Sequence, residues 1–162
     1  MKKNDDRFIT AIFCDDIRQE IGNKLSFMGC YQGELFVQTV PTALTKLCVF
    51  ASILTPIKRP FKSLMLRVVH GDDVELARID IPEESIAEKN QIFDETSTRR
   101  IISTAIVFSP FVIENPTMLR LLATTEEGEI TGPRLLIKVT AIPESAVKAA
   151  KKPKPAKPRT IK

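Results

Sequence analysis

Short apolar runs rich in β-branched and aromatic residues recur along most of this chain, and turn residues separate them. Runs of this length and spacing are typical of strands and leave no room for the long helices of βαβ units. They predict an all-β fold with one short helix: an antiparallel β-sandwich of the immunoglobulin or C2-like kind. The first run is almost continuously apolar, which predicts a strand buried on both faces. The clearest runs are Phe8–Cys14, Leu35–Gln38, Lys46–Leu54, Ser63–Val69, Val74–Ile81, Arg99–Phe108, Thr117–Thr124 and Ile130–Thr140.

A hairpin is predicted around Gly22, where apolar and charged residues alternate on both sides of a turn. A three-residue loop would pair Ile21 with Leu25 and Gln19 with Phe27, and it keeps each face of the hairpin consistent. A two-residue loop would place charge among the apolar side chains, because a slip of one residue inverts the faces. We therefore expect the three-residue loop.

One helix is predicted after the middle of the chain. Pro82-Glu83-Glu84-Ser85 has the features of a helix start, with acidic residues at the positive end of the helix dipole. Ile86, Asn90 and Phe93 follow at helical spacing, which predicts about three turns.

The net charge of +4 is unevenly distributed. Residues 148–162 hold seven bases and no acid, so residues 1–147 carry 17 bases against 20 acids, a net charge of −3. We expect one sandwich domain over residues 1–143 and a disordered tail, rich in Lys, Pro and Ala, over residues 144–162. The tail either binds polyanions such as nucleic acid, weakly and without sequence preference, or only keeps the domain soluble. Its bases are Lys148, Lys151, Lys152, Lys154, Lys157, Arg159 and Lys162.

The residue types that carry most enzyme chemistry are scarce or scattered. His70 is the only histidine and lies in a predicted hairpin turn, so neither a Ser–His–Asp triad nor a Cys–His pair is supported. Cys14, Cys30 and Cys48 lack the paired spacing of a zinc site, and their apolar surroundings predict small core hydrophobes in a reducing compartment. The glycines form no phosphate-binding loop. We therefore expect no catalytic activity and no cofactor.

Three acidic pairs are the remaining candidates for a metal or acid–base site: Asp15-Asp16, Asp72-Asp73 and Glu83-Glu84. Neighbours in a strand point to opposite faces, so the first pair could reach one ion only if a bulge intervened. The second pair fits turn chemistry, and the third fits the start of a helix. We expect structural roles for all three pairs and no bound metal.

The stretch Phe13–Tyr31 has the sequence FCDDIRQEIGNKLSFMGCY. It resembles the opening of a small bacterial and phage family, a domain of unknown function. Members of that family share an FCDD-like start, a Gly-x-Lys turn and a Leu-Ser-x-x-Gly-x-Tyr strand. The resemblance implies a single-domain β-sandwich and supplies no catalytic residues.

These observations favour a non-catalytic binding or assembly module, in which a sheet edge or loops bind a protein partner or a second copy. The alternative is a phage or prophage structural component of the virion, whose basic tail contacts nucleic acid or a neighbouring subunit. No apolar run approaches the roughly 18 residues that span a bilayer, and the charged N-terminus lacks the apolar stretch of a secretory signal. We therefore expect a protein of the cytoplasm, or of the virion if a phage encodes it.

Overall fold

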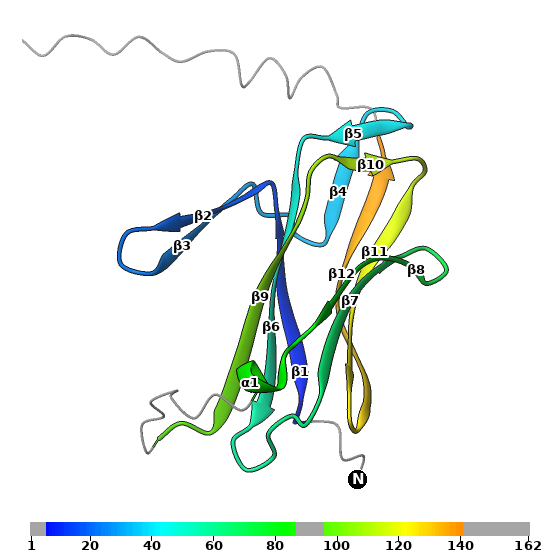
Figure 1. The fold of residues 1–162 in the computed structure, drawn as a ribbon. Helices are drawn as coiled ribbons and strands as arrows, with labels where there is room; N and C mark the ends of the chain where they lie inside the picture. The colour runs from blue at the N-terminus through cyan, green and yellow to red at the C-terminus, as the bar shows by residue number, and fades with distance from the viewer. Residues whose placement is uncertain (1–5, 87–95, 141–162) are drawn as a thin grey trace, which may run out of the picture.

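A computed structural model of the protein describes residues 6–86 and 96–140, and most of these residues lie in strands (Figure 1). The longest strands reach ten to twelve residues, and the helix is a single turn. In chain order the elements are β1 (Phe8–Cys14), β2 (Asp16–Glu20), β3 (Lys24–Met28), β4 (Glu34–Val37), β5 (Thr42–Leu44), β6 (Leu47–Pro56), β7 (Leu64–His70), β8 (Val74–Asp80), α1 (Glu83–Ile86), β9 (Arg99–Phe108), β10 (Phe111–Ile113), β11 (Thr117–Thr125) and β12 (Gly128–Val139).

Two sheets form the layers of a sandwich (Figure 1). The three-stranded sheet has the order β1-β6-β9, and the five-stranded sheet has the order β4-β12-β11-β7-β8. Neighbouring strands run antiparallel except β4 and β12, which are parallel. Two short ribbons, β2–β3 and β5–β10, complete the described part of the chain. The predicted all-β sandwich with one short helix is confirmed.

The hydrophobic core lies between the two sheets, because the central strands alternate inward and outward side chains. On β6 the inward residues Leu47, Val49, Ala51 and Ile53 are fully buried. Burying a Leu, Val or Ile side chain contributes about 1.5–3 kcal/mol, so these residues of β6 make a large contribution to the stability of the domain. The five-stranded sheet contributes buried residues from β7, β11 and β12, among them Leu66, Val68, Leu119, Leu121, Leu135 and Ile137.

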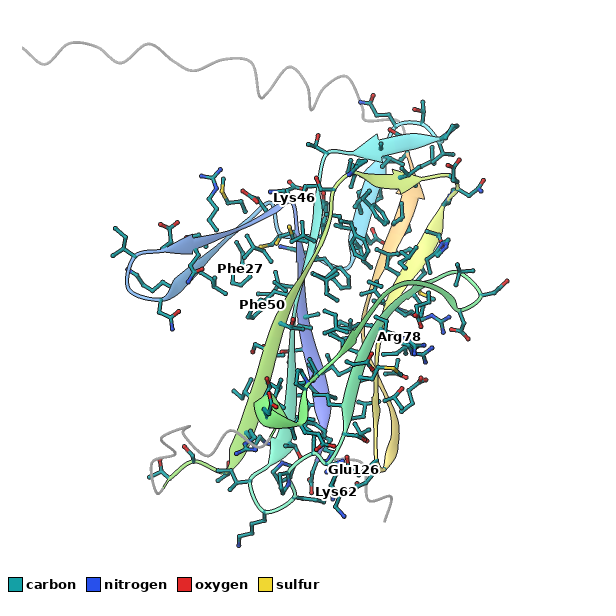
Figure 2. All side chains as sticks on the ribbon, in the orientation of Figure 1. Phe27, Lys46, Phe50, Lys62, Arg78 and Glu126 are labelled. Carbon is teal, nitrogen blue, oxygen red and sulfur yellow. The ribbon has the colours of Figure 1, made fainter. Side chains whose placement is uncertain are left out.

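A buried arginine joins several segments at the lower end of the sandwich. The guanidinium carbon of Arg7 lies 4.6 Å from the ring centroid of Phe61. The same group donates to Thr55 Oγ1 at 3.1 Å and to Glu126 Oε1 at 2.8 Å. Glu126 lies in the β11–β12 turn and also accepts the backbone N–H of Lys62 at 3.0 Å (Figure 2). Arg7 therefore links the start of the three-stranded sheet to a turn of the five-stranded sheet.

β1 differs from its prediction as a strand buried on both faces. Ile9 and Phe13 point into the core, but Phe8, Thr10 and Ile12 are exposed on the opposite face. The prediction was wrong because only the β2–β3 hairpin lies over this side of the sheet among the described residues. A continuous apolar run does not reveal whether a second layer covers it.

The β2–β3 hairpin has a three-residue loop, but the loop begins one residue earlier than predicted, at Ile21. Gln19 consequently pairs with Leu25 rather than with Phe27. The pairing register moves by two residues, so each side chain keeps its predicted face. Gly22 and Asn23 occupy the rest of the loop with φ angles of 82° and 58°.

Three further predictions meet the structure in different ways. The helix α1 buries Ile86, and its predicted continuation through Asn90 and Phe93 lies outside the described residues. The basic tail, with its bases from Lys148 to Lys162, also lies outside them. The strands β5 and β10, of three residues each, were not predicted, because segments this short show no clear periodicity. None of the described residues belongs to a helix that is long and apolar enough to cross a membrane.

Candidate interaction surface

The outer faces of the two sheets differ in charge. On the five-stranded sheet, Arg67 donates to Glu129 at 2.5 Å, and Arg78, which Figure 2 labels, donates to Glu75 at 3.0 Å. The hydrogen bonds from Arg78 hold the pKa of Glu75 below its ordinary value. This face therefore has the polar character of a sheet surface in contact with water.

The outer face of the three-stranded sheet carries four rows of uncharged residues that cross from β1 through β6 to β9. Its one charged side chain among the described residues of these strands is Arg99 at the start of β9, whose guanidinium carbon lies 5.1 Å from the ring centroid of Phe8. Three rows are apolar, and in the other row the hydroxyls of Ser52 and Ser103 hydrogen-bond at 2.8 Å. Ile101 and Val107 on β9 are 50% and 53% exposed. A contiguous apolar surface of this kind is typical of a binding site. We call it the uncharged face; its rows are Phe8, Leu54, Ile101; Thr10, Ser52, Ser103; Ile12, Phe50, Ala105; and Cys14, Cys48, Val107.

The β2–β3 hairpin projects from the upper end of this sheet (Figure 1), and we call it the arm. Phe27 packs on Phe50 with the ring centroids 5.1 Å apart, so the apolar side of the arm is turned toward the uncharged face (Figure 2). Beyond this contact, Leu25 is 43% exposed and Ile21, at the tip, is 96% exposed. The apolar side comprises Ile17, Gln19, Leu25 and Phe27, and the charged side includes Asp16, Arg18, Glu20 and Lys24.

Asp15 makes hydrogen bonds that stabilise the root of the arm. Its backbone N–H donates to the carbonyl of Met28 at 2.9 Å, and its carboxylate accepts the hydroxyl of Tyr31. The carboxylate lies over Gly29, where a Cβ would stand 2.6 Å from Asp15 Cγ. Gly29 also has a φ of 66°, so both the space and the backbone require glycine. Burial, and then the hydrogen bond to Asp15, raise the pKa of Tyr31 and keep its hydroxyl a donor.

Asp16 ties the arm to the three-stranded sheet. Its carboxylate accepts Lys46 Nζ at 2.8 Å and Arg18 Nε at 3.0 Å. These two hydrogen bonds, the Lys46 bond first, lower the pKa of Asp16, and Asp16 in turn raises the pKa of Lys46. Lys46 directly precedes β6, as Figure 2 shows. Exposed ion pairs add little stability, so the main effect is to orient the arm.

Two cysteines lie beneath the root of the arm. Cys14 and Cys48 face each other across β1 and β6, and both are buried. Burial raises the pKa of Cys14 to about 11 and also raises that of Cys48, so both thiols stay protonated near neutral pH. Their prediction as small core hydrophobes is confirmed. It is wrong for Cys30, which is exposed just beyond β3.

The acidic pairs do not converge. Asp15 and Asp16 take different partners, and Asp73 binds Arg120 at 2.6 Å in the β7–β8 turn. Glu83 and Glu84 occupy the first turn of α1. Within residues 6–86 and 96–140, no three His, Cys, Asp or Glu side chains form a group that could hold a metal ion.

His70 ends β7 and lines a hollow of about 290 Å³ together with Val74 and, from β10, Phe111 and Val112. The hollow is mainly apolar. Among the residues that the structure describes, no Ser or Cys lines it, so this part of the chain offers the imidazole neither of the usual nucleophiles. The structure therefore does not assemble a triad around His70.

The free edges of the sheets also differ in charge. Along β8, Glu75, Arg78 and Asp80 are charged, which discourages pairing with another strand. β9 is one of the two edges of the other sheet, and its segment Ile101–Phe108 carries no charge. β9, which is itself part of the uncharged face, is thus better suited to strand addition than β8.

Inspection of the sequence did not identify the uncharged face. Its residues come from Phe8–Cys14, Leu47–Pro56 and Arg99–Phe108, which meet only when the strands pair. One signal was present: after Arg100, no charge alternates with the apolar residues of β9, as it does in a strand with one solvated face.

The sequence matches no protein-family model and no curated protein. The assignment of a function therefore rests on the uncharged face and the arm.

Proposed function

We propose that this protein is a non-catalytic binding or assembly module that holds a protein partner against the uncharged face and the apolar side of the arm. One observation carries the proposal: ion pairs cross the outer face of one sheet, whereas the other outer face has four uncharged rows and a charge only at its lower end, where Arg99 stacks over Phe8. An exposed sheet surface without charge is costly in water unless another molecule covers it.

The root of the arm supports this proposal. Contacts among Asp15, Gly29 and Tyr31 fix the root of the arm on one side. The ion pair between Asp16 and Lys46 fixes it on another side. The tip contacts little of the domain, since Ile21 is almost fully exposed. A hairpin that is fixed at its base and apolar at its tip is suited to contact a partner, because little freedom is lost on binding.

The chemistry of the uncharged face supports a binding role without catalysis. The uncharged face offers hydroxyls from Thr10, Ser52 and Ser103, but no base lies among its rows to activate them. The buried thiols at its upper end, Cys14 and Cys48, are protonated near neutral pH. Such a surface binds by shape and apolar contact.

A photo-crosslinking amino acid at position 25 tests the proposal in the native cells of the protein. The matched control carries the same amino acid at position 18, on the charged side of the arm. We expect a crosslinked protein from position 25 and none from position 18, with mass spectrometry of the product to identify the partner. Equal crosslinking from both positions, or none from position 25, would contradict the proposal.

The charge distribution favours a second candidate, a phage or prophage structural component. Seven bases are confined to residues 148–162, and residues 1–147 carry a charge of −3. Such a tail is suited to contact nucleic acid or an acidic neighbouring subunit. Mass spectrometry of purified virions should detect the chain, and its absence from them would exclude this candidate.

A further inference from the structure

We propose that the partner is a second copy of this chain, with two uncharged faces packed together and each arm lying along the other copy. This inference rests on the proposed function, and it names the partner of the same surface. The resulting dimer has two-fold symmetry, so one pair of surface elements is used twice.

The charge of the surface selects its partner. Burying a charged group against the uncharged face would remove its hydration without providing an opposite charge. The partner surface must therefore be apolar, with a few hydroxyls at most. The outer face of the five-stranded sheet fails this requirement, because Arg67, Glu75, Arg78 and Glu129 lie on it. The uncharged face meets it, and so does the apolar side of the arm.

The area is that of a weak dimer. Adjacent strands lie about 4.8 Å apart and rise about 3.4 Å per residue, so the three strands, without the buried Cys14 and Cys48, and the arm offer about 440 Å² per copy. Two copies would bury about 900 Å², in the range of weak, transient interfaces. A dimer of this size dissociates on dilution, so its mass should depend on concentration.

The arm has the reach that the arrangement needs. Sheets packed face to face lie about 10 Å apart, and a strand of five residues spans about 17 Å. Figure 1 shows the arm leaving the upper end of the sheet steeply rather than lying flat on it. Its tip therefore extends past the plane where a second sheet would pack, and Ile21 and Leu25 would contact that copy.

Light scattering coupled to size-exclusion chromatography of the full chain, over a concentration series, tests the inference. We expect the mass to rise from 18.1 kDa toward twice that value. Ile101→Glu on the face and Leu25→Lys on the arm should each weaken the dimer at least about tenfold, as expected when a charge is buried at an interface. Val112→Lys is the matched control, since Val112 is 54% exposed on β10, outside the uncharged face. It should leave the dimer unchanged.

Mixing the two weakened variants separates this arrangement from others. A mixed dimer contains one native arm-to-face contact. In its other contact, the lysine introduced on the arm of one copy meets the glutamate introduced on the face of the other, so a pair of opposite charges replaces two separate defects. We expect the mixture to recover dimer that neither variant forms alone. All variants should keep the wild-type thermal transition, because the substituted side chains are exposed.

The outcomes are distinct. A chain that stays monomeric at every concentration overturns the second-copy inference, and crosslinking of a different protein at position 25 would then leave the proposed function standing. A dimer that is insensitive to both variants, or equally sensitive to Val112→Lys, places the interface elsewhere and overturns the arrangement. A monomer whose uncharged face becomes accessible only after Phe93→Ala would identify residues 87–95 of the same chain as the occupant.

Discussion

At the scale of the residue, the motif in Phe13–Tyr31 builds the root of the arm. Phe13 packs in the core, Asp15 accepts the hydroxyl of Tyr31, and Gly29 provides the space beneath the carboxylate. The acidic pair in this motif could have indicated a metal site from sequence alone. In the fold, its two carboxylates take part in separate contacts that hold one hairpin.

Gly29→Ala should destabilise the protein more than Gly33→Ala. Both glycines have positive φ, 66° and 85°, so both substitutions incur about 1–2 kcal/mol of backbone strain. Only at Gly29 would the new Cβ displace Asp15 from Tyr31, which adds about 1.5–3 kcal/mol for a hydrogen bond to a charged group. Urea unfolding measures the difference. Equal losses from the two substitutions would show that the carboxylate moves aside without cost.

Glu126 should make the stability depend on pH. Burial alone would raise its pKa, but hydrogen bonds from the backbone of Lys62 and from Arg7 outweigh this effect and lower it from 4.5 to about 2. A lowered pKa in the folded state stabilises the protein above about pH 4.5, and this contribution is lost as the pH falls toward 2. Glu126→Gln should therefore lower Tm at pH 7, and the gap to wild type should close between pH 4.5 and 2.

Circular dichroism melts of the two proteins across this pH range provide the measurement. The control is Glu114→Gln, which changes an exposed carboxylate and should leave Tm near the wild-type value throughout. A gap that persists unchanged at pH 2 would mean that Glu126 acts through packing rather than through its charge.

At the scale of the element, the arm is a two-stranded hairpin, which is marginally stable on its own. The packing of Phe27 on Phe50 is an apolar contact that holds it to the sheet. The arm thus combines a fixed root with a tip that packs on little of its own domain. This combination explains how a short hairpin can stay ordered while it presents Ile21 and Leu25 outward.

Phe27→Ala should loosen the arm without unfolding the sandwich. An aromatic pair contributes about 0.5–1.5 kcal/mol, so amide exchange in β2 and β3 should accelerate about 2- to 10-fold, while exchange in β11 and β12 stays unchanged. Leu25→Ala is the control on the same side of the arm, and in dilute protein it should have little effect. Hydrogen exchange followed by mass spectrometry resolves these segments, and a global acceleration would contradict the local role of Phe27.

At the scale of the whole molecule, charge is segregated. The bases of residues 148–162 contrast with the net charge of −3 on residues 1–147. The domain itself repeats the contrast between its two outer faces, one crossed by ion pairs and the other with four uncharged rows. Any attraction to polyanions should therefore belong to the tail, and apolar binding should belong to the three-stranded sheet.

A chain that ends at Pro143 should lose nearly all affinity for nucleic acid and keep its thermal transition. The full chain should bind a labelled duplex weakly at low salt, with a slope of log affinity against log salt of at most about −6 for seven neutralised phosphates. Fluorescence anisotropy of both chains across a salt series makes the comparison. Equal binding by the two chains would show that the domain carries the basic surface.

Much of this fold was accessible from local sequence patterns. Strands such as Arg99–Phe108 were predicted to the residue, and each side of the β2–β3 hairpin was assigned correctly. Alternation with a period of two and the turn residues around Gly22 are local features, so they can be recognised in the sequence without knowledge of the rest of the fold. Even the displaced register in that hairpin preserved its faces.

Only the tertiary structure decided which side of a strand meets another layer. Phe8–Cys14 has the same apolar sequence whether one face or both are covered, and its pairing with β6, some forty residues away, left one face outside. The uncharged face likewise exists only after three distant segments pair in register. Strand pairing is non-local. Its hydrogen bonds join backbone groups that are the same in every strand, so the sequence of one strand does not indicate which other strands it pairs with.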